Sequence, residues 1–366
     1  MIRYIVFGVV LVIHIIVFGI LFSSPSGEKK QEAPKVEQTE DVVSEQAQGS
    51  TPSASDASEE SQTAAMSAPK KSALEKDTSD PGFHQSPFSK SYFASRNRAL
   101  PAVIKKDVYN CNAAGVFDVN THSLLWGHNE SRSYAIASLT KMMTALLLME
   151  DLHDSSKNVT LQTQVKVTRA ASKIGGRQVW LDPRESFCVE DLLKAMMIRS
   201  ANDCAYQIGE FLAGGDISVF VQRMNLRAKQ LNCNTLYYYN PHGLPTDSRK
   251  ENSGSVSELA YLAERLWHYP ELIKWTSTRI DMIREDTKPF QLVSTNKLLQ
   301  TCSGVVGLKT GMTNKAGYCI VVICEREGRK IIVVVLGTSP QKGGGRMRDK
   351  IAKQLVDWAY MDTGSL

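Results

Sequence analysis

Cysteine motifs that bind metals or build disulfide frameworks are missing from this sequence. Its seven cysteines are scattered over 366 residues, with no C-x-x-C pair and no histidine at zinc spacing. No H-E-x-x-H sequence occurs either, so we expect no metal site and no cofactor. Two of the cysteines lie in apolar, strand-like runs and are predicted to be core thiols, while a single disulfide elsewhere stays open. The seven are Cys111, Cys188, Cys204, Cys233, Cys302, Cys319 and Cys324, of which the last two are the predicted core thiols.

Two further absences narrow the function. A G-x-S-x-G elbow is lacking, which argues against an ordinary Ser-His-Asp hydrolase and makes His242 in "NPHGLP" a structural residue rather than a general base. Signatures of zinc fingers, homeodomains and RNA-binding modules are also lacking. Residues 24–80 hold six Lys and twelve Asp or Glu and are net −6. Since the whole chain is net +5 and Arg3 adds +1, residues 81–366 carry +10. We interpret this charge as a solvated surface and expect no nucleic-acid partner.

A long apolar run is present near the start of the chain. Residues 5–22, "IVFGVVLVIHIIVFGILF", are apolar except for His14, and as a helix they span about 27 Å, close to the hydrocarbon thickness of a bilayer. We therefore predict that residues 1–23 form a transmembrane anchor or a signal segment, with the membrane as a partner. An uncleaved anchor is favoured because "LFSSPSG" makes a poor cleavage site.

The next 75 residues differ sharply in composition. Residues 24–98 are rich in Ser, Glu, Gln, Ala, Pro and Lys and poor in large apolar side chains. Such a segment buries too little surface to offset its chain entropy, so it is predicted to be a disordered linker. Four aromatic residues near its end either dock on the folded part or bind a partner. They are Phe83, Phe88, Tyr92 and Phe93.

The chain becomes globular in composition from residue 99 onward. Residues 113–129 predict a hairpin that turns at Asn120-Thr121, and "AGYCIVVICEREGRKIIVVVLGT" predicts two strands joined by a polar turn. Apolar residues at three- and four-residue spacing predict helices between and after these strands. The helical stretches are "IASLTKMMTALLLMED", "VEDLLKAMMIRS", "DCAYQIGEFLAG", "FVQRMNLRAKQLN", "SVSELAYLAERLWHY" and about 346–360. This order indicates an α/β fold with one antiparallel sheet built from both ends of the domain and covered by helices.

A serine and a lysine at helical spacing open the first of these helices. Ser138 and Lys141 are three residues apart, so a helix places the hydroxyl and the amine on one face. The apolar sequel "MMTALLLME" supplies the burial that a neutral lysine base requires. The same Ser-x-x-Lys pattern starts at Ser26, Ser67, Ser294 and Ser339, but these copies lie in the predicted linker or lack a following apolar helix.

Two more polar motifs follow in order. Ser200-Ala201-Asn202 lies between two predicted helices, and by itself it could be a helix cap. Lys309-Thr310-Gly311 occurs once, before the last two strands, and by itself it could be a solvated strand start. Together with the Ser-x-x-Lys pair they match the motif set of penicillin-binding proteins and β-lactamases, in the right order and in helix, interhelical turn and strand contexts.

Longer stretches strengthen this match. Four stretches of the sequence resemble the serine D-Ala-D-Ala carboxypeptidases among the low-molecular-mass penicillin-binding proteins. They are "VFDVNTHSLLWGHNESRSYAIASLTKMMTALL", "IRSANDCAYQIGEFLAGG", "YNPHGLP" and "GVVGLKTGMTNKAGYC". The resemblance runs from about Ala113 to the end of the chain. It implies a β-lactamase/transpeptidase-like α/β fold, with a five-stranded antiparallel sheet flanked by helices, over a catalytic domain at 99–366. It also implies that the enzyme acts on peptidoglycan stem peptides in the cell envelope, on the periplasmic side of the membrane, and is inhibited by β-lactams.

Carried onto this sequence, the resemblance implies a role for each motif residue. Ser138 would attack the carbonyl between two terminal D-alanines, and Lys141 would be the general base. Ser200 would relay a proton to the leaving amine, while Asn202 would hold Lys141 and the substrate amide. The oxyanion hole would use the backbone N–H groups of Ser138 and Met312.

The lysine motif is implied to bind the substrate. Lys309 would supply positive potential and lower the pKa of Lys141, and Thr310 would offer its hydroxyl to the substrate carboxylate. Gly311 would let a peptide approach the strand edge. Further candidates for carboxylate binding are Lys297, Arg346 and Arg348.

Three alternatives stay open at this point. A D,D-endopeptidase of peptidoglycan cross-links would use the same machinery. A non-catalytic, membrane-tethered wall-binding module would not need the intact Ser138, Lys141 and Lys309. A class A β-lactamase would share the motifs, but no Glu-x-x-Leu-Asn-type stretch follows Asn202 to activate a deacylating water.

Overall fold

A computed structural model describes residues 87–339, 341 and 343–361, all of which lie in one compact unit. The predicted membrane segment at 1–23 and most of the predicted linker lie outside the described residues. Among those described, no helix is long and apolar enough to cross a membrane.

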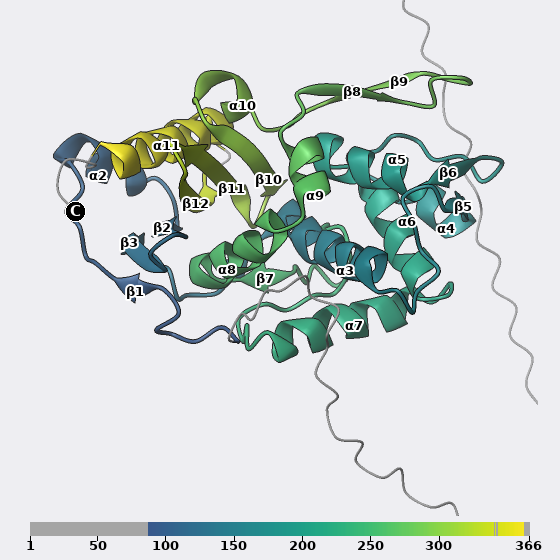
Figure 1. Cartoon of the computed structure of the whole chain (residues 1–366), viewed down its shortest axis with the longest axis horizontal. Coiled ribbons are helices and arrows are strands. Elements are labelled where there is room, and N and C mark those ends of the chain that lie inside the picture. The colour runs from purple at the N-terminus through teal and green to yellow at the C-terminus, as the bar shows by residue number, and fades with distance from the viewer. Residues whose placement is uncertain (1–86, 340, 342, 362–366) are drawn as a thin grey trace, which may run out of the picture. The chain divides into compact units, whose positions relative to one another are not determined.

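The centre of the fold is a mixed sheet of six strands (Figure 1). Their order across the sheet is β1 (Ala94–Ser95), β3 (Ser123–His128), β2 (Ala113–Asp118), β12 (Arg329–Thr338), β11 (Gly317–Arg326) and β10 (Val305–Thr313). Strands from both ends of the domain pair antiparallel, as predicted, and β2 and β3 form the predicted hairpin. The expected five-stranded antiparallel sheet is wrong in one respect, because the short β1 adds a sixth strand parallel to β3.

Side chains alternate across the central strands and build a core on each face of the sheet. On β11, Val321 and Ile323 join one apolar cluster, whereas Ile320 and Val322 join the other. This follows from the two-residue period of a strand, and it explains why β11 and β12 read as continuous apolar runs: both of their faces are covered. Cys319 and Cys324 are fully buried on opposite faces, which confirms them as core thiols. All seven cysteines are free.

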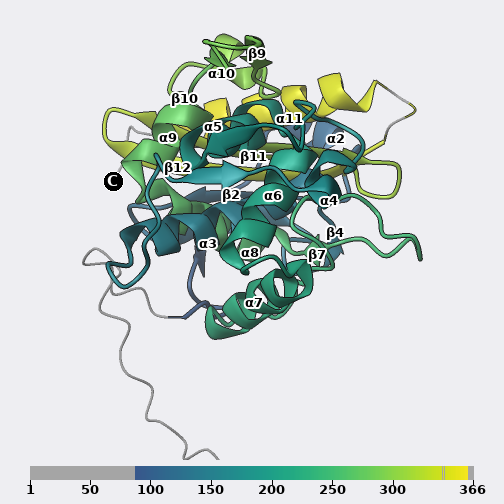
Figure 2. The same ribbon diagram turned by 90° about the vertical axis from the view of Figure 1, so that its right-hand side faces the viewer.

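Helices cover both faces (Figure 2), and the long predicted ones are confirmed. One core lies under α2 and the C-terminal helix α11, and the other holds α3 and α8. Helix α3 is buried on nearly every side, as a helix without a polar face requires. The helical elements are α2 (Ala102–Val108), η1 (Ala137–Thr140), α3 (Lys141–His153), α4 (Arg169–Ser172), α5 (Val189–Lys194), η2 (Ala195–Arg199), α6 (Asn202–Leu212), α7 (Ile217–Gln230), α8 (Val256–Trp267), α9 (Pro270–Thr276), α10 (Leu298–Thr301) and α11 (Gly344–Tyr360).

The last part of the predicted linker belongs to the folded unit. Phe93 is buried in the main core, and Phe88 and Tyr92 pack against that core beside Tyr261. Residues 87–98 therefore dock on the domain, which starts before the predicted boundary at 99. Phe83 lies outside the described residues.

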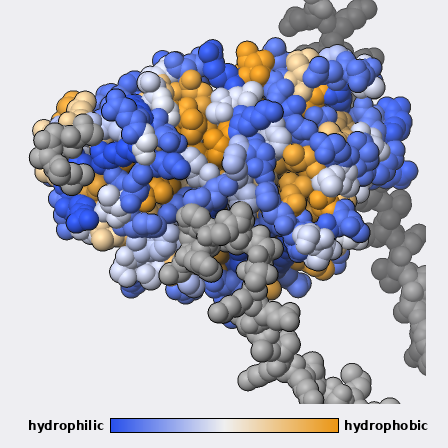
Figure 3. Space-filling view, viewed as in Figure 1, coloured by the Kyte–Doolittle hydropathy of each residue, from blue (hydrophilic) through white to orange (hydrophobic). Residues whose placement is uncertain are grey.

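Three two-stranded sheets complete the fold. They pair β4 (Tyr134–Ala135) with β7 (Ser253–Gly254), β5 (Gln164–Lys166) with β6 (Ser186–Cys188), and β8 (Ile280–Ile283) with β9 (Phe290–Val293). The outer face seen in Figure 3 is mostly hydrophilic, with its apolar side chains in separate patches. Edge strand β10 runs beside η1 and η2, and this junction of sheet and helices holds the site.

Candidate active site

Ser138 lies in the 3-10 turn η1, directly before α3. The preceding Ala137 is fully buried and has a φ of 47°, in the left-handed region. Two hydrogen bonds hold this turn: Thr140 Oγ1 donates to the Ala137 carbonyl at 2.7 Å, and Asn252 Nδ2 donates to Thr140 Oγ1 at 2.8 Å. The serine is therefore carried by an unusual backbone conformation that its surroundings fix.

The loop containing "NPHG" closes over this turn. Asn240 Oδ1 accepts the backbone N–H groups of His242 and Gly243, at 3.2 and 2.6 Å. Gly243 has a φ of 87°, and a Cβ on it would lie 2.0 Å from the Ala137 carbonyl oxygen, so only glycine fits. The sequence analysis identified this segment as part of the family resemblance. Its contact with the serine turn is visible only in the tertiary structure.

Lys141 sends its amine to three oxygen atoms. Its Nζ lies 2.6 Å from the His242 carbonyl oxygen, 2.7 Å from Asn202 Oδ1 and 3.1 Å from Ser138 Oγ. A charged ammonium donates to all three. A neutral amine instead donates to the two closer oxygens and offers its lone pair to the Ser138 hydroxyl, which is the arrangement of a base and its proton donor.

The environment of Lys141 favours that neutral form. The side chain is fully buried, and this burial, helped by the positive charge of Arg177, lowers the pKa of Lys141 from 10.5 to about 7. Nearby Asp203 acts in the opposite direction. The expected repulsion between Lys141 and Lys309 contributes to the lowered pKa of Lys309, and Arg177 is a further cation, not expected from the sequence, that lowers the pKa of Lys141.

The second motif lies at the junction of η2 and α6. Ser200 ends a π-helical turn in the left-handed conformation, with a φ of 66°. This reversal points Asn202 back toward α3, where its Nδ2 donates to the Gly175 carbonyl at 2.9 Å while its Oδ1 accepts from Lys141. The predicted contact between Asn202 and Lys141 is present.

Asp203, next to the motif, was missed by the sequence analysis. Its buried carboxylate accepts the backbone N–H groups of Val179, Leu181 and Cys204 at 2.9 to 3.4 Å. Burial raises its pKa, and these bonds partly reverse the rise. Asp203 thereby anchors the loop at 175–181 against α6.

The third motif lies on edge strand β10, beside the other two. Lys309 is buried, and its Nζ donates to Ser200 Oγ at 2.7 Å and to the Thr310 carbonyl at 2.9 Å. Burial, together with the charges of Lys141, Arg177 and Arg348, lowers the pKa of Lys309 well below its usual value. The two oxygens Thr310 Oγ1 and Thr295 Oγ1 are 2.6 Å apart and share a hydrogen bond.

Gly311 faces the serine turn across the site. A Cβ on Gly311 would lie 3.0 Å from the Ile136 carbonyl oxygen and 3.1 Å from the Ser138 backbone nitrogen. The absence of a side chain keeps strand and turn in close contact. Met312 is half-exposed at the mouth of the site.

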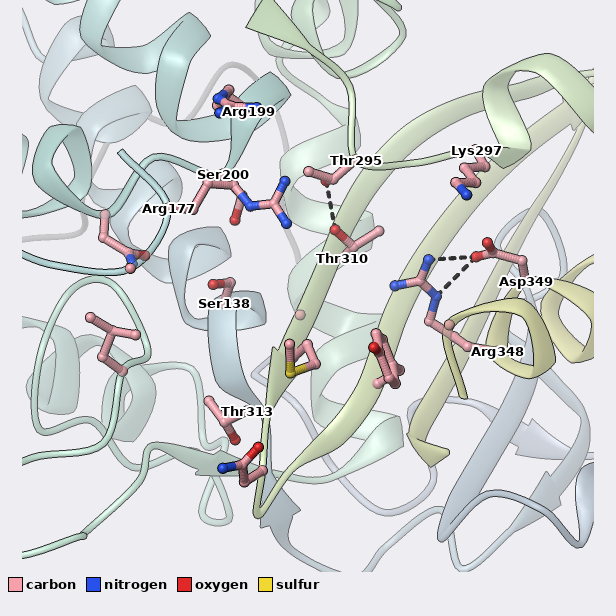
Figure 4. A pocket seen from close by; sticks show the side chains of 18 of the residues that line it. Ser138, Arg177, Arg199, Ser200, Thr295, Lys297, Thr310, Thr313, Arg348 and Asp349 are labelled. Atoms are coloured by element: carbon pink, nitrogen blue, oxygen red, sulfur yellow. Dashed lines mark hydrogen bonds and ion pairs between the residues drawn. The ribbon is translucent and has the colours of Figure 1, made fainter. Parts of the chain in front are cut away.

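A cavity of about 910 Å³ opens over these residues (Figure 4). Of the predicted residues, six line it: Ser138, Ser200, Asn202, Thr310, Gly311 and Met312. The two buried lysines, Lys141 and Lys309, lie beneath this lining and are bonded to it. The structure thus brings all eight predicted site residues together.

Comparison with known proteins agrees with this geometry. The family model described as D-alanyl-D-alanine carboxypeptidase matches residues 102–340. The chain belongs to this family. It is 32% identical over 274 residues to D-alanyl-D-alanine carboxypeptidase DacF of Bacillus subtilis, covering 75% of this chain and 67% of that one. It is also 26% identical over 230 residues to a D-alanyl-D-alanine endopeptidase of Escherichia coli, covering 61% and 70%.

A solved structure shares the carboxypeptidase fold. Penicillin-binding protein D2 of Listeria monocytogenes, in its ampicillin-bound form, matches with a TM-score of 0.60 and 29% identity. The match covers 68% of this chain and 96% of that one.

Several cations surround the carboxypeptidase motifs. Of the predicted carboxylate ligands, Arg348 is buried and pairs with Asp349 through bonds of 2.6 and 2.9 Å, whereas Arg346 and Lys297 are exposed at the cavity rim. Arg177 and Arg199 also line the cavity and were missed, because neither belongs to a motif.

His242 fits the structural role predicted for it. Its Nδ1 accepts the Leu244 backbone N–H, and burial lowers its pKa to about 3, so the ring stays neutral. Its backbone carbonyl, rather than its ring, contacts Lys141. Within the described part of the chain, no cluster of three or more His, Cys, Asp or Glu side chains could hold a metal ion.

Proposed function

We propose that this member of the carboxypeptidase family removes the terminal D-alanine from peptidoglycan stem peptides, with Ser138 as nucleophile and Lys141 as base. One observation carries the assignment: a fully buried Lys141, with a pKa of about 7, lies 3.1 Å from Ser138 Oγ at the floor of an open cavity. A pKa near the working pH is the property that a general base needs. Because peptidoglycan is the substrate, the reaction takes place in the cell envelope.

Acylation follows from the hydrogen bonds of Lys141. Its two N–H bonds are directed at Asn202 Oδ1 and the His242 carbonyl, so its lone pair takes the proton from Ser138 as Oγ attacks the D-Ala-D-Ala carbonyl. The backbone N–H groups of Ser138 and Met312 stabilise the oxyanion that forms.

The leaving group is released through the second and third motifs. As the peptide C–N bond breaks, Lys141 gives up the proton that it took from Ser138, and Ser200, which is hydrogen-bonded to Lys309, relays a proton to the amine of the departing D-alanine, so that Lys141 is neutral again. Water then attacks the acyl-enzyme, with Lys141 accepting its proton, and Ser138 is regenerated with its hydroxyl proton restored.

Substrate binding uses the free edge of the sheet. Strand β10 is an outermost strand, so a peptide can pair with it as an added strand. Gly311 leaves room for that approach, and the Thr310 hydroxyl faces the terminal carboxylate.

A D,D-endopeptidase is the second candidate. One relative carries that name, and an endopeptidase would use the same catalytic residues. Incubating the protein with a defined pentapeptide and with a cross-linked dimer, then weighing the products, separates the two activities. Loss of one terminal alanine from the pentapeptide alone supports the carboxypeptidase. Cleavage of the dimer alone supports the endopeptidase, and cleavage of neither contradicts both.

A separate labelling experiment tests the nucleophile. We expect a labelled penicillin to attach covalently to Ser138, as shown by peptide mapping, and expect Ser138→Ala to lose both labelling and turnover. Labelling that persists unchanged in Ser138→Ala contradicts the assignment.

The apolar run at 5–22 supports a further part of the proposal. Such a run would anchor the enzyme in the membrane, with residues 24–86 as a tether that lets the catalytic part reach the peptidoglycan.

A further inference from the structure

An exposed aromatic pair lies beside the cavity, outside the three motifs. Trp180 is 62% exposed, and the edge of its ring meets the ring of Phe290, with 5.6 Å between the ring centroids. Phe290 begins strand β9, which ends at Val293, an exposed apolar residue that lines the cavity. Single apolar side chains are normal on a protein surface, but a continuous strip that leads into a cavity indicates a contact with a ligand.

The loop that carries Trp180 is fixed by its surroundings. Trp180 has a φ of 55°, in the left-handed region that a bulky residue rarely occupies. The Asp203 carboxylate accepts the backbone N–H groups of Val179 and Leu181. Arg284, in the turn between β8 and β9, donates to the carbonyls of Val179 and Trp180, both at 2.9 Å. An unfavourable backbone conformation that is held on both sides is typical of functional positions, and here it holds an indole in solvent.

The aromatic pair lies beyond the leaving-group end of the cavity. Arg199 lines the cavity next to Ser200, the residue proposed to relay a proton to the leaving amine. The Arg199 guanidinium also lies 5.7 Å from the centroid of the Phe290 ring. Figure 4 shows Ser200 between Ser138 and Arg199, with Thr313 on the opposite side of Ser138. The acyl part of a substrate therefore extends toward Thr313, and a group attached to the leaving amine extends past Arg199 toward the aromatic pair.

The size of the leaving group decides whether a substrate reaches this pair. A carboxypeptidase releases a single D-alanine, which ends inside the cavity. In a cross-linked peptide the same amine belongs to a second stem peptide, the leaving strand, which continues out of the cavity.

The charge of the cavity favours a peptide in this position. Five of the residues that line the cavity are cations and two are acids. A leaving strand has a C-terminal carboxylate of its own and so matches this excess of positive charge better than a neutral sugar does. The cations are Arg177, Arg199, Lys297, Arg346 and Arg348, and the acids are Glu251 and Asp349.

We infer that Trp180 and Phe290 form a subsite for the leaving strand of a cross-linked stem peptide, so that the protein cleaves cross-links as well as terminal D-alanine. This inference rests on the proposed function and deepens it. The chemistry is unchanged: the bond from Ser138 Oγ to the D-alanine carbonyl forms, and the C–N bond to the leaving strand breaks. The amine of the leaving strand departs with the proton relayed through Ser200, and water then releases the acyl chain from Ser138.

The test compares two sugar-free substrates, a stem pentapeptide ending in D-Ala-D-Ala and a cross-linked peptide dimer. The wild-type protein should cleave both. Trp180→Ala should lower the ratio of kcat/KM for the dimer to kcat/KM for the pentapeptide by about 5- to 30-fold. The loss should appear mainly in the KM of the dimer, because the contact lies away from the reacting bond. Trp180→Phe keeps an aromatic ring in the same place and should restore most of the ratio.

A matched control removes an aromatic side chain of similar exposure elsewhere. Tyr109 is 65% exposed directly after α2, far from the β8–β9 hairpin (Figure 1), and Tyr109→Ala should leave the ratio unchanged. An unchanged ratio in Trp180→Ala, or an equal loss in Tyr109→Ala, overturns the inference while the carboxypeptidase stands. A wild-type protein that cleaves the pentapeptide but not the dimer has the same consequence.

Two other outcomes are distinguishable from these. A dimer whose leaving strand carries its disaccharide tests a sugar as the occupant. If Trp180→Ala impairs cleavage of that dimer alone, the pair binds the sugar and the inference is overturned. If the wild-type protein cleaves none of the substrates, the proposed function fails and the inference falls with it.

Discussion

The charge state of Lys141 is the feature most open to direct test. An ordinary lysine is neutral in roughly one molecule in 3,000 at pH 7, whereas a pKa of about 7 makes half of the molecules neutral. This shift of about 3.5 pH units corresponds to about 5 kcal/mol against the protonated form. Lys141→Arg keeps a long cation in the same place but removes the neutral state, because guanidinium does not lose its proton.

The assay is the rate of penicillin acylation between pH 5 and 10. For the wild-type enzyme we expect the rate to rise as pH passes through about 7 and then to level off. Lys141→Arg should be at least about 100-fold slower and should show no such rise, since a general base contributes about 10²- to 10⁴-fold. The same exchange at exposed Lys173, outside the cavity, should leave the profile unchanged. A Lys141→Arg rate near that of the wild type would refute the reasoning.

The same shift has a consequence for stability. Between pH 7 and 10.5 the unfolded chain holds a proton on Lys141 that the folded protein has released. The free energy of unfolding of the wild type, relative to Lys141→Met, should therefore rise by about 1.4 kcal/mol per pH unit in this window and stay flat below it. Denaturant unfolding at pH 6, 7, 8 and 9 measures this difference, and a slope of zero above pH 7 would show that the buried amine stays charged.

Three other perturbations have defined outcomes. Gly311→Ala should push the turn at Ser138 by a few tenths of an ångström and lower the kcat of acylation by about 10-fold or more at similar KM. Gly175→Ala is the control and should have little effect, because its Cβ meets no atom within 4 Å. Equal acylation rates in the two variants would contradict the close contact between Gly311 and the serine turn. Burial raises the pKa of Glu264 from 4.5 to about 7, so the wild type loses stability as pH rises from 4.5 to 7. Glu264→Gln should therefore be more stable than the wild type by up to about 3 kcal/mol at pH 8, but not at pH 4. Thermal melts at both pH values measure this gain, and an equal gain at both would exclude ionisation of Glu264 as its cause. Removing residues 1–22 should yield a soluble enzyme with full acylation activity in the absence of detergent, and aggregation of that protein would argue against an independent catalytic part.

Local patterns predicted most of the fold because they are set by local geometry. Helix α8 has apolar residues at helical spacing because it packs against the core, and β11 and β12 are continuously apolar because both of their faces are covered. Strand β1 has no such signal, since two residues carry no period. Its pairing with β3 depends on Phe93 and Tyr92, which dock from a segment whose composition resembles a linker.

The catalytic motifs were predictable for a similar reason, and their surroundings were not. The three-residue spacing of Ser138 and Lys141 places them together on one helical face whatever the rest of the chain does. The acceptors that hold the Lys141 amine come from positions 61 and 101 residues later, one of them a backbone carbonyl that no side-chain pattern can reveal. Arg177 is still less visible, because a single arginine in a polar loop is usually a solvated residue.

The burial that makes Lys141 reactive also explains why the site draws on so many parts of the chain. An amine without water around it needs an oxygen for every N–H bond that it retains, and an unsatisfied one costs about 1–3 kcal/mol. Asn202 and the His242 carbonyl supply those oxygens, and each is fixed by a further layer: Asn202 by Gly175, and the His242 loop by Asn240. A loosening of either layer would let water reach the amine and raise its pKa toward that of free lysine. Gly175 and Asn240 therefore affect the reactivity of Ser138 without contacting the substrate. Substitutions at these two residues should change the pH profile of acylation before they change substrate binding.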